Sequence, residues 1–114
     1  MNLCVPVTQD SQIDLRWGRA DRVAVASLIE GRIGDWQEFE VGWGALHDSG
    51  GEGEHHARIA RFLREHDVSV VIAGHMGPPM QHMLAKMGIA VHLGAAGAAQ
   101  EATLRAVSQG RRSN

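Results

Sequence analysis

The sequence predicts an α/β fold in which a mixed sheet is covered by helices, and three observations support this prediction. Residues 68–73 are almost continuously apolar, which is typical of a strand buried on both faces of a sheet. The flanking segments 54–66 and 78–87 repeat their apolar residues with helical spacing. Glu30-Gly31 separates two β-rich runs and predicts a hairpin.

The first half of the chain reads as three strands. A short apolar strand over 3–7 leads into a polar loop over 8–21. Alternating apolar residues then predict strands over 22–29 and 32–41. This half of the chain therefore contributes a strand followed by a hairpin.

The second half alternates helices and strands. Residues 42–54 contain five glycines and show almost no periodicity, and a loop of this length in a compact domain is usually functional or disordered. We expect it to be long and mobile. After it, the sequence predicts in turn a helix, a strand, a helix, a strand and a helix, over 54–66, 68–74, 78–87, 89–93 and 98–108.

These elements predict one five-stranded mixed sheet with three helices. Right-handed crossovers place the fourth strand beside the first and the fifth beyond it. The expected strand order is 3-2-1-4-5, with strand 2 antiparallel. We expect a single domain over residues 1–110, followed by a frayed tail over 111–114.

Composition excludes several classes of function. The net charge of −2 and the isoelectric point of about 6.4 give no electrostatic reason to bind nucleic acid or an anionic membrane. No apolar run approaches the about 18 residues of a membrane span, and no signal peptide is expected at the amino terminus. The single cysteine, Cys4, fits a reducing cytoplasm.

Histidine is the most informative residue type in this composition. The chain has seven histidines but no tyrosine and only two phenylalanines. Histidine is the commonest metal ligand. His75 follows the fourth strand, within Gly74-His75-Met76-Gly77, just before the second helix begins. In open α/β sheets ligands bind at the carboxyl ends of strands, so His75 is a candidate metal ligand; the alternative is a histidine bonded to a loop carbonyl.

His55 and His56, at the start of the first helix, are the other candidate metal ligands. Neighbouring helical side chains diverge, so the two cannot easily bind one metal ion together, and either one is a candidate ligand; the alternative is a pair of solvated histidines. Arg19 is a candidate contact for an anionic group, the alternative being a surface salt bridge of little value. Met76 could add a soft sulfur contact.

The remaining candidate ligands have simpler explanations. We expect His92 to be a hydrogen-bonded core residue, His66 and His82 to lie on helix surfaces, and His47 to lie in a loop. Met80 and Met83 read as core residues, and Cys4 as a buried small hydrophobe. No Cys-x-x-Cys pair is present, so the chain cannot enclose a metal cluster with four cysteines. Any metal cluster that it bound would be held by one or two open ligands, by shape, or between subunits.

The sequence does not favour an enzyme. A two-metal nuclease needs several converging carboxylates, but the first strand has no acid before Asp10 and the fourth has none. No Gly-x-x-x-x-Gly-Lys loop or nucleophile elbow is present.

Short motifs spread along residues 1–110 resemble the dinitrogenase iron-molybdenum cofactor binding and biosynthesis family, which includes NifX-like proteins and the carboxyl-terminal domain of NifB-like proteins. Each motif is weak alone, but their order and spacing are fairly specific. The matching segments are Val5-Pro6-Val7, Gly18-Arg19-Ala20, His55-His56, Ala73-Gly74, Met76-Gly77-Pro78, Gly88-Ile89 and Leu93-Gly94.

The resemblance implies a ribonuclease-H-like fold and a non-enzymatic role in metallocluster biosynthesis and nitrogen fixation. The protein would bind an iron-sulfur or iron-molybdenum cofactor or its precursor, and exchange it with donor and acceptor proteins. Together with the residues selected from their positions, the candidate cofactor-binding residues are His55, His56, His75, Met76, Arg19, Gly74 and Gly77. Two positions depart from the family: Arg16-Trp17 stands where His-Phe is common, and His75 where a small residue is common.

Two other functions stay open at this stage. Gly74 to Gly77 and the amino terminus of the second helix could bind a phosphate or nucleotide without metal. An interaction or regulatory domain would be favoured if the edge strand and an exposed Trp36 or Trp43 formed a homodimer surface.

Overall fold

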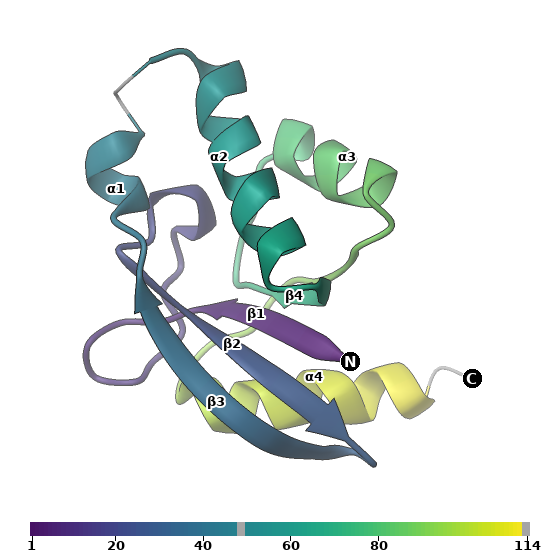
Figure 1. The fold of residues 1–114 in the computed structure, drawn as a ribbon. Coiled ribbons are helices and arrows are strands. Elements are labelled where there is room, and N and C mark those ends of the chain that lie inside the picture. The colour runs from purple at the N-terminus through teal and green to yellow at the C-terminus, as the bar shows by residue number, and fades with distance from the viewer. Residues whose placement is uncertain (48–49, 113–114) are drawn as a thin grey trace.

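The computed structural model of the protein, which describes residues 1–47 and 50–112, has a five-stranded sheet as its middle layer (Figure 1). The strand order is β3-β2-β1-β4-β5. Strand β2 is antiparallel to β1 and β3, while β1, β4 and β5 are parallel. The predicted order and the predicted antiparallel strand are therefore confirmed; the ribonuclease-H-like classification stays a prediction. The strands are β1 Asn2–Pro6, β2 Arg22–Ile29, β3 Arg32–Glu40, β4 Val68–Ile72 and β5 Ala90–His92.

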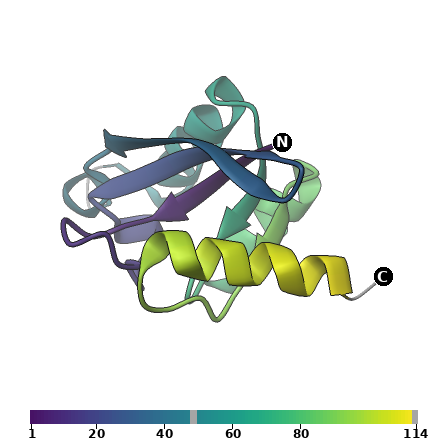
Figure 2. The same ribbon diagram turned by 90° about the horizontal axis from the view of Figure 1, so that it is seen from below.

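Helices cover both faces of the sheet. Helices α2 and α3 pack on one face and α4 on the other, as Figures 1 and 2 show from two directions. The helices are α1 Trp43–Leu46, α2 Glu52–Glu65, α3 Pro78–Lys86 and α4 Ala99–Arg112, with a 3-10 turn, η1, at Trp17–Arg19. None of the helices in the described part of the chain is long and apolar enough to cross a membrane.

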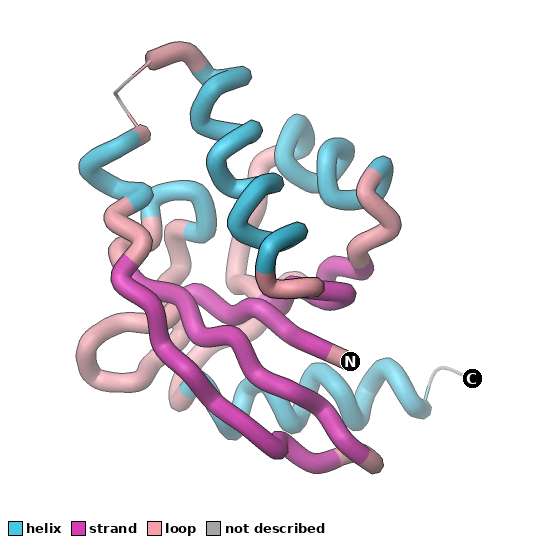
Figure 3. Tube along the Cα trace, in the orientation of Figure 1, coloured by secondary structure: helices cyan, strands magenta, loops and turns pink. Residues whose placement is uncertain are grey.

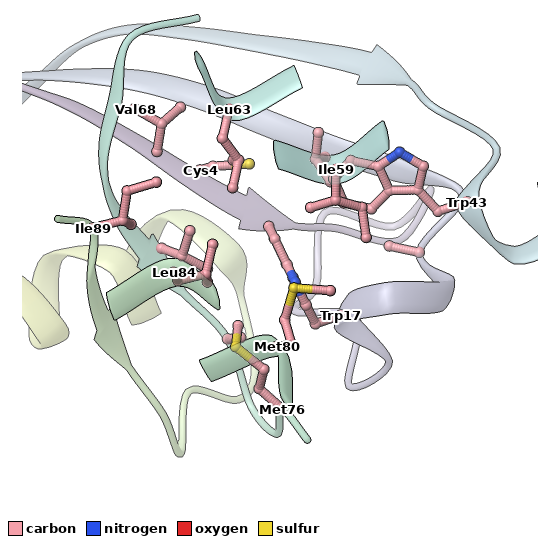
Figure 4. Close-up of a cluster of buried hydrophobic side chains, with 14 residues drawn as sticks. Cys4, Trp17, Trp43, Ile59, Leu63, Val68, Met76, Met80, Leu84 and Ile89 are labelled. Atoms are coloured by element: carbon pink, nitrogen blue, oxygen red, sulfur yellow. The ribbon is translucent and has the colours of Figure 1, made fainter. Parts of the chain in front are cut away.

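The alternation of side chains along β1 divides the core into two parts. Cys4 faces α2 and α3 and belongs to the cluster drawn in Figure 4, with Ile59 and Leu84 among its members. Leu3 and Val5 point to the opposite face. There they meet the alanines of α4, whose small side chains allow the helix to approach the sheet closely.

The segment 42–54 differs from the long mobile loop that was predicted. It contains helix α1, so the fold has four helices rather than three, and α2 begins at Glu52 (Figure 3). Trp43 is only 2% exposed and packs edge-on against Trp17 and Phe62, so it does not meet the condition of an exposed Trp43 on which an interaction surface there depended. The buried indole of Trp43 holds this segment against the core, whereas the glycines of the segment had indicated a loop. Residues 48–49 lie outside the described residues.

The loop 8–21 is also more ordered than its polar composition suggested. Isolated bridges join Val7 to Ile13 and Gln12 to Ala98. Ile13, Asp14 and Trp17 are buried, so the loop forms part of the core.

Three smaller outcomes concern the ends of elements. Glu30 and Gly31 both have positive φ angles, 53° and 79°, as the predicted tight hairpin turn requires. Gly88, with φ 76°, follows the end of α3. Helix α4 continues to Arg112, beyond the expected start of the tail, and residues 113–114 lie outside the described residues.

Cys4 should be chemically inert while the protein is folded. Its side chain is fully buried, and burial raises the pKa of the thiol because the thiolate would lose its hydration. The thiolate is the reactive form. We expect labelling by iodoacetamide at pH 8 to be very slow in the native protein and fast in guanidinium chloride. Fast native labelling would contradict the burial.

The same shift fixes the direction of a pH effect on stability. The folded state keeps the thiol protonated, whereas the unfolded chain loses the proton near the ordinary pKa of 9.0. The free energy of unfolding should therefore fall as the pH rises above that value. Cys4→Ala should remove this contribution, which chemical denaturation at pH 8 and pH 10 would measure.

Candidate functional site

A cavity of about 240 Å³ lies where the segment after β4 meets η1 and the first turns of α2 and α3. Six of the seven predicted site residues line it: Arg19, His55, His56, His75, Met76 and Gly77. Gly74 does not line it. The other lining residues, which sequence reasoning did not select, are Leu15, Arg16, Trp17, Gly18, Glu52, Pro79 and Met80.

The corner that carries His75 is held by backbone hydrogen bonds. The amide of Gly94 donates to the Gly74 carbonyl at 3.0 Å. Gln81 Nε2 donates to the carbonyl of Met76 at 2.8 Å. The His75 side chain is exposed and forms no hydrogen bond or ion pair with the described residues. Its imidazole therefore stands on a fixed backbone and is available to a ligand.

His55 has a different environment, because both of its ring nitrogens have protein partners. It is 3% exposed. Nε2 donates to the Gly18 carbonyl at 2.7 Å, and Nδ1 accepts from Arg58 Nη1 at 2.8 Å. A carbonyl can only accept and a guanidinium can only donate, so these partners set the tautomer. As placed here, His55 ties η1 to α2 and has no free ring nitrogen for a metal.

His56 is the freer member of the pair. Its side chain is 22% exposed, and Nε2 lies 3.8 Å from Glu52 Oε1, one helical turn earlier. This contact is longer than a hydrogen bond. The neighbouring positions thus have separate environments: His55 is fixed within the protein, and His56 borders the cavity with only a weak partner.

The two arginines at the cavity also differ. Arg16 forms a two-point pair with Asp14, with both N–O distances at 3.2 Å, and this contact raises the pKa of Arg16. The Arg19 side chain is exposed and has no hydrogen bond or ion pair with the described residues. Of these two arginines, Arg19 is therefore the one whose charge no described residue balances.

The inner wall of the cavity is apolar and rich in sulfur. Met76, Met80 and Trp17 line it, and each is 6% exposed or less; Figure 4 shows the three side chains together. Met76 and Met80 belong to the core cluster, and Met83 packs against it. Trp17 was not predicted as a site residue, and the only signal was the Arg16-Trp17 departure from the resembled family.

The other histidines lie away from the cavity. His82 is exposed, as predicted. His66 is half-buried rather than on the surface, because its ring packs 4.7 Å from that of Phe39. His47, at the end of α1, packs its ring 5.1 Å from that of His55, and His92 is half-buried in β5.

The arrangement supplies donors and soft contacts without a closed metal site. Across residues 1–47 and 50–112, no three His, Cys, Asp or Glu side chains lie close enough to hold a metal ion together. Imidazoles, an unbalanced arginine and two thioethers border one apolar cavity. This set suits an anionic cluster held by few bonds and by shape, since imidazole and sulfur are ligands for iron and softer metals.

A model of the family described as "Dinitrogenase iron-molybdenum cofactor" matches residues 1–110. The chain belongs to this family. No curated protein matches the chain. The family membership predicted from the short motifs is therefore confirmed over nearly the whole sequence.

Three solved structures share the fold of this family member. "Crystal structure of PH0822" aligns with a TM-score of 0.75 and 18% identity, covering 96% of this chain and 92% of the other. The apo orange protein from Desulfovibrio gigas gives 0.74 and 20%, covering 95% and 88%. A putative NifB protein from Thermotoga gives 0.70 and 24%, covering 96% and 89%.

Replacing His55 should destabilise the protein more than replacing its neighbour. His55→Ala removes the partner of the Gly18 carbonyl and leaves the Arg58 guanidinium with only its 3.4 Å contact to the Leu46 carbonyl. This should lower the free energy of unfolding by about 1–3 kcal/mol. His56→Ala, the matched control, should cost less than about 1 kcal/mol. Urea denaturation of both variants measures the difference, and equal losses would contradict the assigned hydrogen bonds.

The two predicted glycines should also respond differently to alanine. A Cβ on Gly74 would lie 2.7 Å from Leu15 Cδ2 and 3.0 Å from the Ala95 carbonyl oxygen. Gly74→Ala should lower the free energy of unfolding by about 1–3 kcal/mol. At Gly77 the nearest atom would be Pro79 Cδ at 3.8 Å, so Gly77→Ala should change stability by less than about 1 kcal/mol. Thermal denaturation would reveal a reversed order.

Proposed function

We propose that this protein binds an iron-sulfur or iron-molybdenum cluster, or its precursor, as cargo in the cavity, and passes it on without catalysing a reaction. The observation that carries the proposal is the convergence of His56, His75 and Arg19 on one apolar cavity lined by methionine sulfur. These residues come from three segments that are far apart in the sequence. The family's description and the earlier resemblance support the same class of cargo.

Each residue has a distinct proposed role. His75 and His56 are the candidate ligands, and His55 positions η1 against α2 rather than binding metal directly. Arg19 would balance the negative charge of the cluster, and Met76 would contact it through sulfur. Gly77 precedes α3 with an ordinary extended backbone and presents no side chain to the cargo, and Gly74 allows close packing behind the cavity.

An open site suits transfer of cargo between proteins. A cluster held by one or two side chains can be displaced by the ligands of an acceptor, whereas a closed four-ligand site would retain it. We therefore propose that cluster donor and acceptor proteins approach the cavity, in metallocluster biosynthesis in the cytoplasm. A homodimer with facing cavities is a second way to complete the ligand set.

The alternative of a phosphate or nucleotide module is less well supported. Helix amino termini bind phosphate through free backbone N–H groups. Helix α3 begins with Pro78 and Pro79, and proline has no N–H. The amino terminus beside the cavity therefore offers fewer donors than a typical phosphate site.

Anaerobic loading of the purified protein tests the proposal. Ferrous iron with sulfide is one probe, and tetrathiomolybdate, a molybdenum–sulfide anion, is the other. After desalting, we expect retained metal and a visible absorption band. His75→Ala and His56→Ala should each weaken retention by about tenfold or more, whereas His82→Ala, an exposed histidine outside the cavity, should not.

Two results would count against the proposal. Failure of the wild type to retain either probe, under conditions where a known carrier loads, would contradict it. Binding of inorganic phosphate in the same preparation would then favour the alternative module. Equal losses in His82→Ala and His75→Ala would mean that metal binds to surface histidines in general.

A further inference from the structure

Trp17 carries the one buried side-chain nitrogen or oxygen, among the described residues, that has no hydrogen-bond partner. Its side chain is 2% exposed, and its indole N–H is shielded from solvent. Buried donors are nearly always paired, because an unmade hydrogen bond forfeits the hydration that burial removed. A ligand with an acceptor atom could supply the missing hydrogen-bond partner of the Trp17 indole N–H.

The residue that carries the unpaired donor lines the cavity. Trp17 lines it together with Met76 and Met80, and Figure 4 draws the three side chains in the same part of the cluster. The ring is fixed from behind by Trp43, whose centroid is 5.2 Å away at an interplanar angle of 72°. Met80 is unbranched and has several rotatable bonds, so it can move aside without disturbing the backbone.

We infer that the Trp17 indole N–H is a binding group of this cavity, donating a hydrogen bond to a sulfide or oxo atom of an anionic cargo. The inference rests on the proposed function and adds a residue and a chemical class to it. Arg19 at the rim and the Trp17 N–H at the wall would then meet one ligand from two sides. Both groups only donate, so they select a cargo that presents acceptor atoms.

The donor set favours an anion over a neutral or cationic ligand. Besides Arg19, the cavity is bordered by Arg16, whose charge Asp14 already balances. Glu52 is the only carboxylate among the lining residues that the structure describes. Sulfide atoms of a cluster accept hydrogen bonds, and such bonds tune and stabilise bound clusters.

Trp17→Phe tests the inference, because phenylalanine keeps an aromatic ring and removes the N–H. The matched control is Trp36→Phe, the same substitution at a half-buried tryptophan of β3 that does not line the cavity. Affinity is measured on whichever of the two probes, iron with sulfide or tetrathiomolybdate, the wild type binds. A hydrogen bond to an anion predicts a loss of about tenfold or more in Trp17→Phe, with little change in Trp36→Phe.

Nuclear magnetic resonance of the wild type can detect the hydrogen bond directly. If Trp17 had only a structural role, its indole N–H signal would not change on binding. Its three tryptophans, Trp17, Trp36 and Trp43, give three assignable indole N–H signals. On titration with diamagnetic tetrathiomolybdate, the Trp17 signal should shift downfield and exchange more slowly with solvent deuterium. This measurement does not require the variant to fold.

The outcomes separate the inference from the proposed function. Binding by the wild type, with a selective loss in Trp17→Phe, supports both. Equal binding by wild type and Trp17→Phe, or a Trp17 signal that does not move when tetrathiomolybdate binds, overturns the role of Trp17 and leaves the carrier function intact. Absence of binding of both probes to the wild type overturns both.

Discussion

The hydrogen bond from His55 to the Gly18 carbonyl determines how the cavity is built. It fixes the 3-10 turn η1 against the first turns of α2 at a distance of 2.7 Å. Arg58 extends the connection, since its guanidinium also lies 3.4 Å from the carbonyl oxygen of Leu46 in α1. Three segments from different parts of the chain are thus held by one buried imidazole. This connection, together with the packing of Trp17 against Trp43, holds η1 at the cavity.

The histidines of this site are of two kinds: one stabilises the fold, and the other is available to bind a ligand. A buried imidazole with two protein partners contributes to rigidity, because its removal would leave polar groups unpaired. An exposed imidazole on a rigid corner, such as His75, contributes little to stability and keeps its nitrogens for a ligand. Placing both kinds around one cavity gives preorganised walls with an open face, which is the combination that reversible binding needs.

The sheet was predictable from sequence because its signals are local and repeated. The apolar run at Val68–Ile72 and the turn at Glu30-Gly31 each predict an element from adjacent residues, and the handedness of crossovers then fixes the strand order. The corner at His75 followed from that order, as a strand end beside a helix start. The same reasoning brought Arg19 and the 55–56 pair to the correct edge.

The parts that sequence did not predict depend on contacts between distant residues. His55 and His56 are the same residue type at adjacent positions, and only the direction of each side chain separates them. Trp17 lies in a stretch with a polar composition, and its burial depends on Trp43, 26 residues later in the chain. The glycines around Trp43 similarly led to the prediction of a loop where the structure has helix α1. The periodicity of apolar residues indicates local elements only, so it does not predict contacts between distant residues such as Trp17 and Trp43.

The positions of the chain ends have a consequence for how this domain can be joined to others. The cavity lies beyond the carboxyl end of β1, whereas the amino terminus lies at the start of that strand, and α4 brings the carboxyl end back to the same side (Figure 1). Both attachment points therefore face away from the opening. A tether, surface anchor or neighbouring domain linked at either end would leave the opening accessible.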